Sequence, residues 1–416
     1  MGRSHGKTHM THFESSQPIP VPMSSPDLSD AERQAVMGVL NTPSLSMGAQ
    51  IEAFEAAFKR YTGAAHAIGV SSGTAGLHLC VRAAGIRPGD LVITTPFSFV
   101  ASANVLLFEG AVPIFVDVDP RTGNIDPAQV AQAADDLADG GASFRRWLPR
   151  GLRRKKIGAL KALLPVDVFG QPANMPAIRK VASTHGLKVI EDACEALGGE
   201  ILGQKAGTLG DYGVFAFYPN KQITTGEGGL IVTNDGEAAG MMRALRNQGR
   251  APGDTWLQHT YLGYNYRMDE MSAALGVVQM RRLDELLIRR QQVADWYNER
   301  LAEIPGLQPP RLAGTTTRVS WFVYVIRLIG GDSKAAAQRR SDVAKALGER
   351  GIPVRPYFLP IHTQPYMVER FGFRHGDYPV TEDLGSRSLA LPFSGKMSEA
   401  QVERVCSALG VVLQTC

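Results

Sequence analysis

The chain has 416 residues, more than a single hydrophobic core usually serves, so two domains are expected. Hydrophobic residues make up 44% of the sequence and charged residues 20%, a balance that excludes a disordered tail protein, a coiled coil and a collagen-like repeat. The net charge is only +4 and no apolar run approaches the roughly 18–20 residues of a membrane-spanning helix, so neither nucleic acid nor a membrane is an expected partner.

The beginning of the chain, MGRSHGKTHMTHFESS, is polar and lacks the apolar segment of a secretory signal. We expect residues 1–17 to be a disordered leader outside the fold. The cysteines lie far apart and form no CxxC pair, which predicts neither a disulfide framework nor a zinc site, and no other metal is expected. They are Cys80, Cys194, Cys406 and Cys416. These features favour the reducing cytoplasm.

The first clear element is a helix that begins near residue 51. Ile51, Phe54, Phe58 and Tyr61 share one face of it, and Gly63 can end it. Short apolar runs then predict buried strands at 66–70, 91–95, 112–118, 162–168, 187–192, 213–217 and 229–233. Their continuous apolar character is typical of strands covered on both faces, as in a mainly parallel α/β sheet, whose ligands bind beyond the carboxyl ends of the strands.

A helical pattern over about 269–303 carries the chain away from this sheet. Beyond it, one strand and two helices are predicted, at 321–328, 333–350 and 398–409. We therefore divide the chain into a large domain over 18–290 and a small α+β domain over 291–416. Residues 18–32 can pack on the small domain instead.

One segment, FRRWLPRGLRRKK at 144–156, carries seven basic residues and no acidic one. It is either a solvated surface loop or a flap that faces a phosphate-bearing ligand over an active site. Nucleic-acid binding is not expected, because the rest of the chain is nearly charge-balanced and lacks a recognised module.

Lys221 lies in a short connection after a predicted strand, within FAFYPNKQITTGEGGLIVT. Its neighbours are Phe215, Phe217, Tyr218 and Pro219 on one side and Gly226, Gly228 and Gly229 on the other. The apolar neighbours would desolvate the amine and favour its neutral form, which condenses with a carbonyl group. The glycines would let the backbone pass close to a bulky ligand. A solvated surface charge is the alternative interpretation.

Asp192 ends a predicted buried strand in VIEDACEALGG, where an unpaired carboxylate would be costly. It is either an ion-pair or helix-capping residue, or the partner of a protonated heterocycle nitrogen, as in pyridoxal-phosphate (PLP) enzymes. The run VSSGTAGLHL, a strand followed by a helix start, offers free backbone N–H groups for an anion. The run TTPFSFVASAN places Phe97 and Phe99 at a strand end, where one of them could cover a planar ring.

An anion cradle, an aromatic lid, an aspartate and a lysine in this chain order resemble the fold-type I PLP-dependent aminotransferases. More narrowly, the sequence resembles the nucleotide-sugar aminotransferases of the DegT/DnrJ/StrS group over roughly residues 18–410. The similar blocks are SSPDLSDAE, LSMGAQIEAFEAAF, SSGTAGLHL, VDVFGQP, EDACEALGG, YPNKQITTGEGG, GYNYRMDEMSAALG, LPIHTQPY and LALPF. The resemblance implies an α/β fold with a mainly parallel seven-stranded sheet between helices and a smaller α+β C-terminal domain.

The resemblance also implies roles for individual residues. Lys221 would hold PLP covalently and shuttle a proton, and Asp192 would keep the pyridine nitrogen protonated. Phe99 would stack on the ring, with Phe97 as the second choice. The remaining cofactor contacts would come from Gly73 and Thr74, which would bind the phosphate, and from Asn265, which would reach the phosphate of the neighbouring subunit in a homodimer with shared active sites.

Two positions depart from the common family pattern. Ala216 stands where a serine usually binds the phosphate, which should weaken cofactor binding by about 1 kcal/mol. Glu195 stands where many members have Gln or His near the PLP phenolic oxygen, and its carboxylate would be repelled there unless it is protonated or turned toward the substrate.

The sequence E-A-L-G around Glu195 is most similar to the perosamine-synthase type, which aminates C4 of a 4-keto-6-deoxy sugar nucleotide. The resemblance therefore implies an aminotransferase that works by a ping-pong mechanism, with L-glutamate as donor and a keto-sugar nucleotide as acceptor. An aminotransferase for a keto-cyclitol in aminoglycoside biosynthesis and a regulatory protein on the same fold are the alternatives. His259, Tyr357 and His362 are further candidates for substrate contacts, or else structural residues.

Overall fold

The computed structural model describes residues 19–153 and 157–415, and the predicted leader at 1–17 lies outside this part. At its centre is a seven-stranded sheet in the order β1-β9-β8-β5-β4-β2-β3. β9 is antiparallel to both of its neighbours, and the other neighbouring pairs are parallel. The strands are β1 (His66–Val70), β2 (Leu91–Thr94), β3 (Val112–Phe115), β4 (Leu160–Leu164), β5 (Lys188–Asp192), β8 (Tyr212–Ala216) and β9 (Gly229–Thr233).

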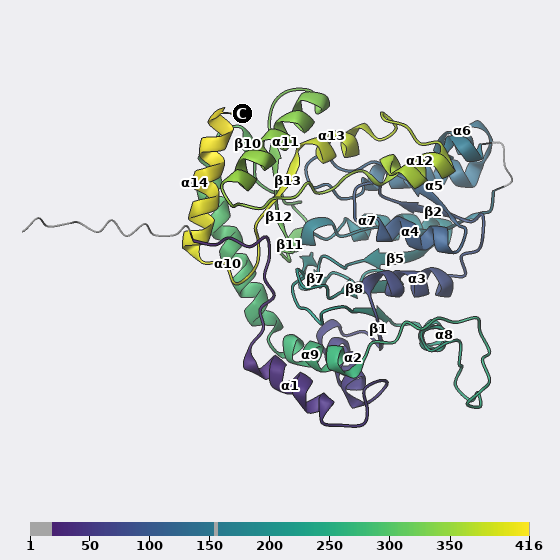
Figure 1. The fold of residues 1–416 in the computed structure, drawn as a ribbon. Helices are drawn as coiled ribbons and strands as arrows, with labels where there is room; N and C mark the ends of the chain where they lie inside the picture. Colours follow the sequence, from purple (N-terminus) through teal and green to yellow (C-terminus); the bar gives the residue numbers. More distant parts are fainter. Residues whose placement is uncertain (1–18, 154–156, 416) are drawn as a thin grey trace, which may run out of the picture.

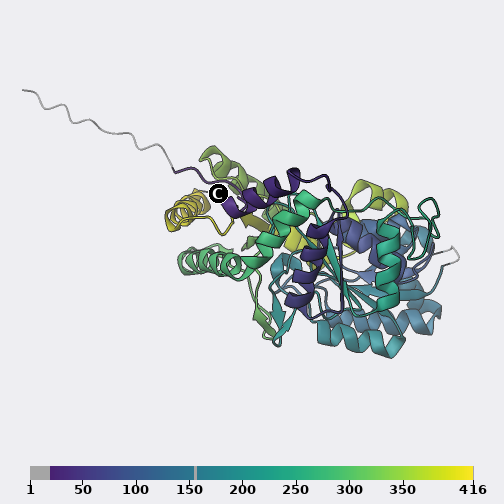
Figure 2. The same cartoon turned by 90° about the horizontal axis from the view of Figure 1, so that it is seen from below.

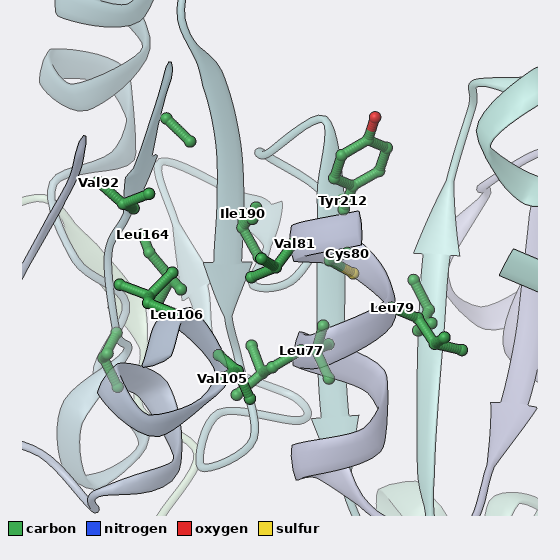
Figure 3. Packing of buried hydrophobic residues seen from close by; sticks show 14 of the residues in the cluster. Leu77, Leu79, Cys80, Val81, Val92, Val105, Leu106, Leu164, Ile190 and Tyr212 are labelled. Carbon is green, nitrogen blue, oxygen red and sulfur yellow. The ribbon is translucent and has the colours of Figure 1, made fainter. Parts of the chain in front are cut away.

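Helices cover both faces of this sheet, which confirms the predicted α/β class (Figure 1). One face carries α3 (Gly73–Ala83), α4 (Ala101–Phe108) and α8 (Gly236–Arg246). The other carries α2 (Ala49–Thr62), α5 (Pro127–Asp139) and α7 (Met175–His185). Figure 3 shows the first face, where Leu77 and Val81 of α3 pack against Ile190 of β5. None of the described helices has both the length and the apolar character of a membrane span.

The predicted strands coincide with β1 and β9, but several others end earlier than the apolar runs do. For the run over 162–168, for example, β4 ends at Leu164, although Val166 still pairs with Asp192 in an isolated bridge and Val166 and Val168 remain buried. Loop residues at the carboxyl edge of the sheet are therefore as apolar as the strands, and hydrophobicity alone does not mark where the strand ends.

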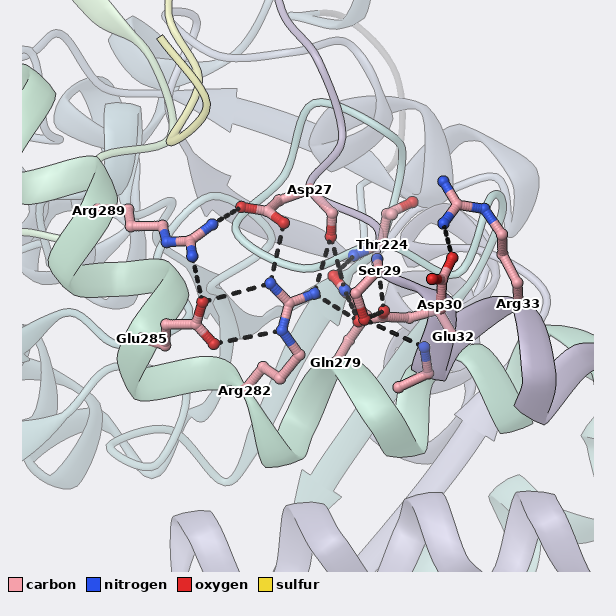
Figure 4. Close-up of polar contacts among 11 residues, drawn as sticks. Asp27, Ser29, Asp30, Glu32, Arg33, Thr224, Gln279, Arg282, Glu285 and Arg289 are labelled. Carbon is pink, nitrogen blue, oxygen red and sulfur yellow. Dashed lines mark hydrogen bonds and ion pairs between the residues drawn. The ribbon is translucent and has the colours of Figure 1, made fainter. Parts of the chain in front are cut away.

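The predicted helical stretch over 269–303 is two helices, α9 (Glu270–Arg281) and α10 (Leu283–Leu301), which meet at Arg282. The guanidinium of Arg282 pairs with Asp27 at 2.9 Å and with Glu32 at 2.7 Å (Figure 4). Glu285, in the first turn of α10, completes the cluster at 3.3 Å. These acidic side chains hold the Arg282 side chain at the point where the two helices change direction. The partners Asp27 and Glu32 lie far away in the sequence, so the local helical periodicity of 269–303 does not reveal the break.

The small domain is built on a three-stranded sheet covered by α10, α11 (Ser333–Glu349) and α14 (Glu399–Thr415). The strands are β10 (Leu307–Gln308), β12 (Tyr324–Leu328) and β13 (Ser388–Leu391). Val21 packs in the core of this domain, whereas α1 (Asp30–Leu40) packs on α9 of the large domain. The segment over 18–32 thus serves both domains, and the proposed boundary at 290 falls inside α10.

A second small sheet lies where the two domains meet, with β11 (Thr316–Arg318) paired to β6 (Glu200–Ile201). Its third strand is β7 (Gln204–Lys205). The remaining helices are α6 (Gly141–Trp147), α12 (Pro365–Phe371) and α13 (Pro379–Arg387), with short 3-10 turns at η1 (Arg150–Leu152), η2 (Val168–Gly170) and η3 (Ile361–Thr363). Figure 2 shows the same arrangement from below, with the small domain beside the layered large domain.

The basic segment is not the predicted loop throughout, because its described part forms the end of α6 and the turn η1. Arg146 pairs with Asp136 and Arg150 pairs with Asp377, both at 2.5 Å. The segment leads into the amino end of β4, which lies at the edge of the sheet opposite Asp192. Residues 154–156 of the segment lie outside the described residues. Its described part therefore does not form a flap over the site in its own subunit.

Candidate active site at the carboxyl edge of the sheet

Three of the predicted site residues, Gly73, Asp192 and Lys221, lie where the parallel strands β1, β5 and β8 end. Asp192 is the last residue of β5, and Lys221 follows β8 in a turn closed by a 2.9 Å hydrogen bond from its N–H to the carbonyl of Tyr218. Gly73 begins α3 directly after β1. Parallel strands bring their carboxyl ends to one edge, so the chain order of the motifs becomes a single spatial cluster.

Asp192 is held as a fixed hydrogen-bond acceptor. It is 4% exposed, and its Oδ2 accepts a 2.7 Å hydrogen bond from the hydroxyl of Ser102 on α4. Its Oδ1 accepts a 3.2 Å hydrogen bond from the N–H of Cys194. Ser102 also lies within 3.4 Å of the carbonyl of Phe99, which ties the aspartate to the segment that carries the aromatic lid. Sequence reasoning missed Ser102, because no local pattern links two residues that are 90 positions apart.

The side chain of Lys221 is 13% exposed, and its Nζ lies 3.8 Å from Oε1 of Glu195. The Nζ also lies 3.8 Å from the centre of the Phe322 ring, which comes from the small domain. The expected source of desolvation was wrong: Phe215 and Phe217 pack in the core against α2, and Tyr218 is exposed. The apolar cover over the lysine comes from the other domain.

Glu195 is buried and faces Lys221. Its Oε2 accepts a 2.9 Å hydrogen bond from the N–H of Phe169, whose backbone adopts the left-handed region at φ +60°. Burial raises the pKa of the Glu195 carboxyl, although the charge of Lys221 acts in the opposite direction. Tyr357 lies close by in an aromatic stack with Phe169 and Phe322. The carboxyl is thus turned toward the lysine, a contact that the sequence did not predict.

The start of α3 forms the predicted anion cradle. Ser72 caps the helix by accepting a 3.1 Å hydrogen bond from the N–H of Ala75, and no helical carbonyl can accept from the N–H groups of Gly73 and Thr74. A Cβ at Gly73 would lie 2.7 Å from the Cβ of Ala216, so a side chain does not fit there. The cradle is therefore lined by backbone and suits a phosphate group.

Two of the glycines after Lys221 have roles within the protein itself. A Cβ at Gly229 would lie 2.5 Å from the backbone of Ser72, so this glycine lets β9 approach the cradle. Gly226 adopts φ +82° in a turn, a conformation that glycine accepts without strain.

The two candidate aromatic residues behave differently. Phe97 is fully buried, with its ring between those of Phe169 and Phe358 at 5.9 and 5.8 Å. Phe99 is 62% exposed. Of the two rings, that of Phe99 is therefore the one exposed enough to cover a ligand. Phe99 is also the residue that the family resemblance favoured for stacking on the cofactor ring.

Asn265 and His259 lie in the connection between α8 and α9, which projects from the body of the molecule beneath α8 (Figure 1). Both are exposed, and the Nδ1 of His259 lies 2.9 Å from the carbonyl of Gln248. The carbonyl of Tyr266 accepts a 2.8 Å hydrogen bond from the N–H of Ser71, so Asn265 lies beside the cradle of its own subunit. The same connection exposes large apolar side chains, namely Trp256, Leu257 and Leu262.

His362 is fully buried, and its Nε2 lies 2.9 Å from Oε1 of Glu382. Its ring packs against Tyr378 at 4.8 Å. Burial lowers the pKa of His362 despite this carboxylate. The contacts described for His362 are with Glu382 and Tyr378 and not with Lys221 or Asp192. They fit a structural role for His362, the alternative to a substrate contact.

Two fully buried carboxyl groups lie behind Asp192. Glu191 accepts hydrogen bonds from the N–H groups of a neighbouring loop, at Gly207, Leu209 and Gly210. Asp167 accepts a 2.8 Å hydrogen bond from the N–H of Ala173, and its buried Oδ2 has no hydrogen-bond partner among the described residues. Burial raises the pKa of Asp167 well above its usual range, and the charge of Glu191 adds to the effect. We infer that, of these two buried carboxyl groups, Asp167 is the one that carries a proton.

Replacing Asp167 with asparagine should stabilise the protein near pH 7. The pKa of this carboxyl is higher in the folded state than in the unfolded state. At a pH above the ordinary pKa of aspartate, the carboxyl is therefore protonated more often when the protein is folded, and the wild type loses stability as the pH rises. An amide keeps the shape and stays neutral, so the gap between the two proteins should widen from pH 4.5 to pH 8. Urea unfolding across this range measures it, and a gap that is constant or reversed in sign would contradict the assignment.

The chain is similar to known aminotransferases in sequence and in fold. The chain is 39% identical over 395 residues to the GDP-perosamine synthase of Caulobacter vibrioides, covering 94% of this chain and 98% of that one. It is 34% identical to the UDP-N-acetyl-3-dehydro-alpha-D-glucosamine 3-aminotransferase of Acidithiobacillus ferrooxidans, covering 89% and 90% of the two chains. The solved structure of S. venezuelae DesV superposes with a TM-score of 0.81 at 31% identity, covering 94% of this chain and 98% of that one.

A sequence model of the DegT/DnrJ/EryC1/StrS aminotransferase family matches residues 26–410, nearly the whole chain. The match includes every strand of the central sheet and every candidate residue of the site. This chain belongs to the DegT/DnrJ/EryC1/StrS aminotransferase family.

Proposed function

We propose that this aminotransferase holds PLP on Lys221 and moves an amino group from L-glutamate to C4 of a 4-keto-6-deoxy sugar nucleotide in two alternating half-reactions. The observation that carries the proposal is the enclosure of the Lys221 amine between Glu195 and Phe322, at the same sheet edge as Asp192. The family is PLP-dependent, and sugar-nucleotide aminotransferases are among the relatives.

The residues present fit PLP. The cradle at Gly73 and Thr74 offers backbone donors to a phosphate and has no room for a side chain at Gly73. Phe99 exposes a ring face, and Asp192 presents a carboxylate held by two hydrogen bonds. Phosphate donors, a flat aromatic surface, an anion and an amine are the groups that a phosphorylated pyridine aldehyde requires.

When bound, PLP supplies an electron sink for the carbon atom that exchanges the amino group. The protein supplies the rest. Asp192 holds a proton on the ring nitrogen, and Lys221 Nζ carries the proton between the two carbon positions. Glu195 accepts or donates at that Nζ from 3.8 Å, helped by a pKa that burial has raised toward neutrality. Phe322 covers the amine and keeps water away from it.

Two features support the sugar nucleotide as acceptor and C4 as the position. The E-A-L-G sequence at Glu195 is similar to that of the perosamine-synthase type, and GDP-perosamine synthases are among the relatives. A panel of keto-sugar nucleotides, with the amino position of each product located by NMR, tests the proposal. We expect a C4 amine. A C3 amine would place the enzyme with the 3-aminotransferase relative instead, and turnover of keto-cyclitols alone would overturn the nucleotide-sugar assignment.

We also propose a homodimer in which Asn265 serves the partner's phosphate site. Asn265→Asp places an anion before a phosphate and should weaken PLP binding by about 1–3 kcal/mol. Lys221→Ala removes chemistry from its own subunit. A mixed dimer of these two variants has one site with both lesions and one intact site, so mixing two weakly active proteins should restore activity toward half that of the wild type per dimer.

Asn265 lies beside the cradle of its own subunit. The mixed dimer therefore decides whether Asn265 serves the phosphate site of its own subunit or that of the partner. Heterodimers are confirmed by two different affinity tags, and each variant alone is the baseline. If proven heterodimers recover nothing while the Asn265→Asp homodimer is defective, the residue serves its own site or none.

A further inference from the structure

Arg290 is a buried cation that lies directly behind Lys221. It belongs to α10, the helix that leads from the large domain to the small one, and it is 4% exposed. Among the described residues no carboxylate lies within ion-pair distance of it, and burial lowers its pKa to about 10. A buried guanidinium without an ion pair is costly unless its N–H groups are used in hydrogen bonds.

The hydrogen bonds of Arg290 go to backbone carbonyls of two segments that are far apart in sequence. Its Nη2 donates to the carbonyl of Lys221 at 2.5 Å and to that of Asn220 at 3.3 Å. Its Nη1 donates to the carbonyls of Trp321 and Phe322 at 3.1 and 3.3 Å. One guanidinium group therefore binds the lysine turn of the large domain and the start of the small-domain segment that enters β12.

These two segments are the ones that enclose the reactive amine. The ring of Phe322 lies 3.8 Å from Nζ of Lys221, and the backbone of both residues is fixed by the same side chain. Lysine could not replace this arginine, because an ammonium group is a point donor, whereas the planar guanidinium donates in two directions with a fixed angle between them.

We propose that Arg290 is a positioning residue that couples the two domains at the active site by fixing Lys221 against Phe322. This role rests on the proposed function of Lys221. A 1 Å displacement of a reacting group can cost about 10²-fold in rate, so the loss of Arg290 should act on the step that Lys221 performs and not on the affinity for the amino donor.

The first experiment needs no cofactor. Hydrogen exchange of the apoprotein is compared for wild type, Arg290→Met and Arg290→Lys, with Arg289→Met as the matched control. Arg289 is the preceding residue of the same helix, but its side chain is 47% exposed and pairs with Asp27 and Glu285 (Figure 4). We expect exchange at 218–224 and 320–323 to rise about tenfold together in both Arg290 variants, and to stay unchanged in the control.

The second experiment uses the protein loaded with PLP and follows the spectral change after glutamate is added in a single turnover. Arg290→Met should lower the rate constant about 10- to 100-fold and leave the half-saturating glutamate concentration unchanged. Arg290→Lys should lower it as well, because it keeps the charge but loses the planar fork. A residue that only supports folding would reduce the amplitude, through a smaller active fraction, and leave the rate constant of the folded protein unchanged.

Each result decides one question. Unchanged exchange in the two segments, or a change in amplitude alone, would overturn the positioning role. If Arg290→Met does not fold, Arg290→Lys carries the test, since it keeps the charge but loses the planar fork that donates to both segments. A wild-type protein that shows no spectral response to PLP or glutamate would overturn the proposed function, while hydrogen exchange would still decide whether Arg290 links the domains.

Discussion

Lys221→Ala should lower amino transfer by about 10³- to 10⁴-fold, while folding is retained. The loss is large because one side chain supplies both the covalent attachment and the proton transfer, and positioned acid–base groups alone contribute about 10²- to 10⁴-fold. Little loss of stability is expected, because the amine is held by a 3.8 Å contact to Glu195 and by the Phe322 ring rather than by a hydrogen-bond network.

Borohydride treatment of the PLP-loaded wild type should fix the cofactor mass to the peptide that contains Lys221. The control is Lys205→Ala, because Lys205 also lies against an aromatic ring, 4.1 Å from that of Tyr61, but on β7 away from the cradle. Its activity and its labelled peptide should match the wild type. Label on any other lysine, or full activity of Lys221→Ala with glutamate, would refute the assignment.

The sequence predicts the main residues of the site because each belongs to a contiguous motif at a strand end. Asp192 closes an apolar strand, Gly73 opens a helix after another, and Lys221 follows a third. The rule that parallel strands bring their carboxyl ends to one edge then converts three local patterns into one site. Such inference needs only that these strands are parallel, which the alternation of strands and helices predicts.

The residues that hold these groups in place could not be predicted in this way. Ser102, Phe322 and Arg290 reach the site from α4, the small domain and α10, and their contacts depend on how the elements pack. The apolar neighbours of Lys221 in the sequence were the wrong ones for the same reason. Adjacent residues on a strand point to opposite faces, so proximity in sequence does not imply contact with the amine.

The break at Arg282 and the position of the basic segment show a related limit. Helical periodicity continues through the junction of α9 and α10, because the interactions that form the bend come from Asp27 and Glu32 near the start of the chain. The positive charge at 144–156 left both a solvated loop and a phosphate-facing flap open, and arginines of its described part pair with carboxylates at the opposite edge of the sheet. A cluster of charged residues in the sequence therefore does not show where in the fold the cluster lies or which groups pair with it.

Asp192→Asn should lower the rate of both half-reactions by about 10²- to 10³-fold, the usual cost of removing a group that stabilises charge in a transition state. Asparagine has nearly the same shape, and its carbonyl oxygen can still accept from the Ser102 hydroxyl, so the fold should be retained. The neutral amide cannot hold a proton on the pyridine nitrogen, and the cofactor then withdraws electrons less strongly. Single-turnover rates with glutamate measure this loss.

Ser102→Ala separates the charge of Asp192 from its orientation. This variant keeps the carboxylate but removes the 2.7 Å hydrogen bond to its Oδ2, leaving the N–H of Cys194 as the remaining described donor. We expect about a tenfold loss of rate, corresponding to roughly 1.4 kcal/mol and consistent with one hydrogen bond to a charged group. Asp295→Asn, at a half-buried position of α10 where the side chain accepts a hydrogen bond from Gln291, is the control and should match the wild type. If Asp192→Asn keeps the wild-type rate, the carboxylate is structural, and the proton on the ring nitrogen must be held by another group.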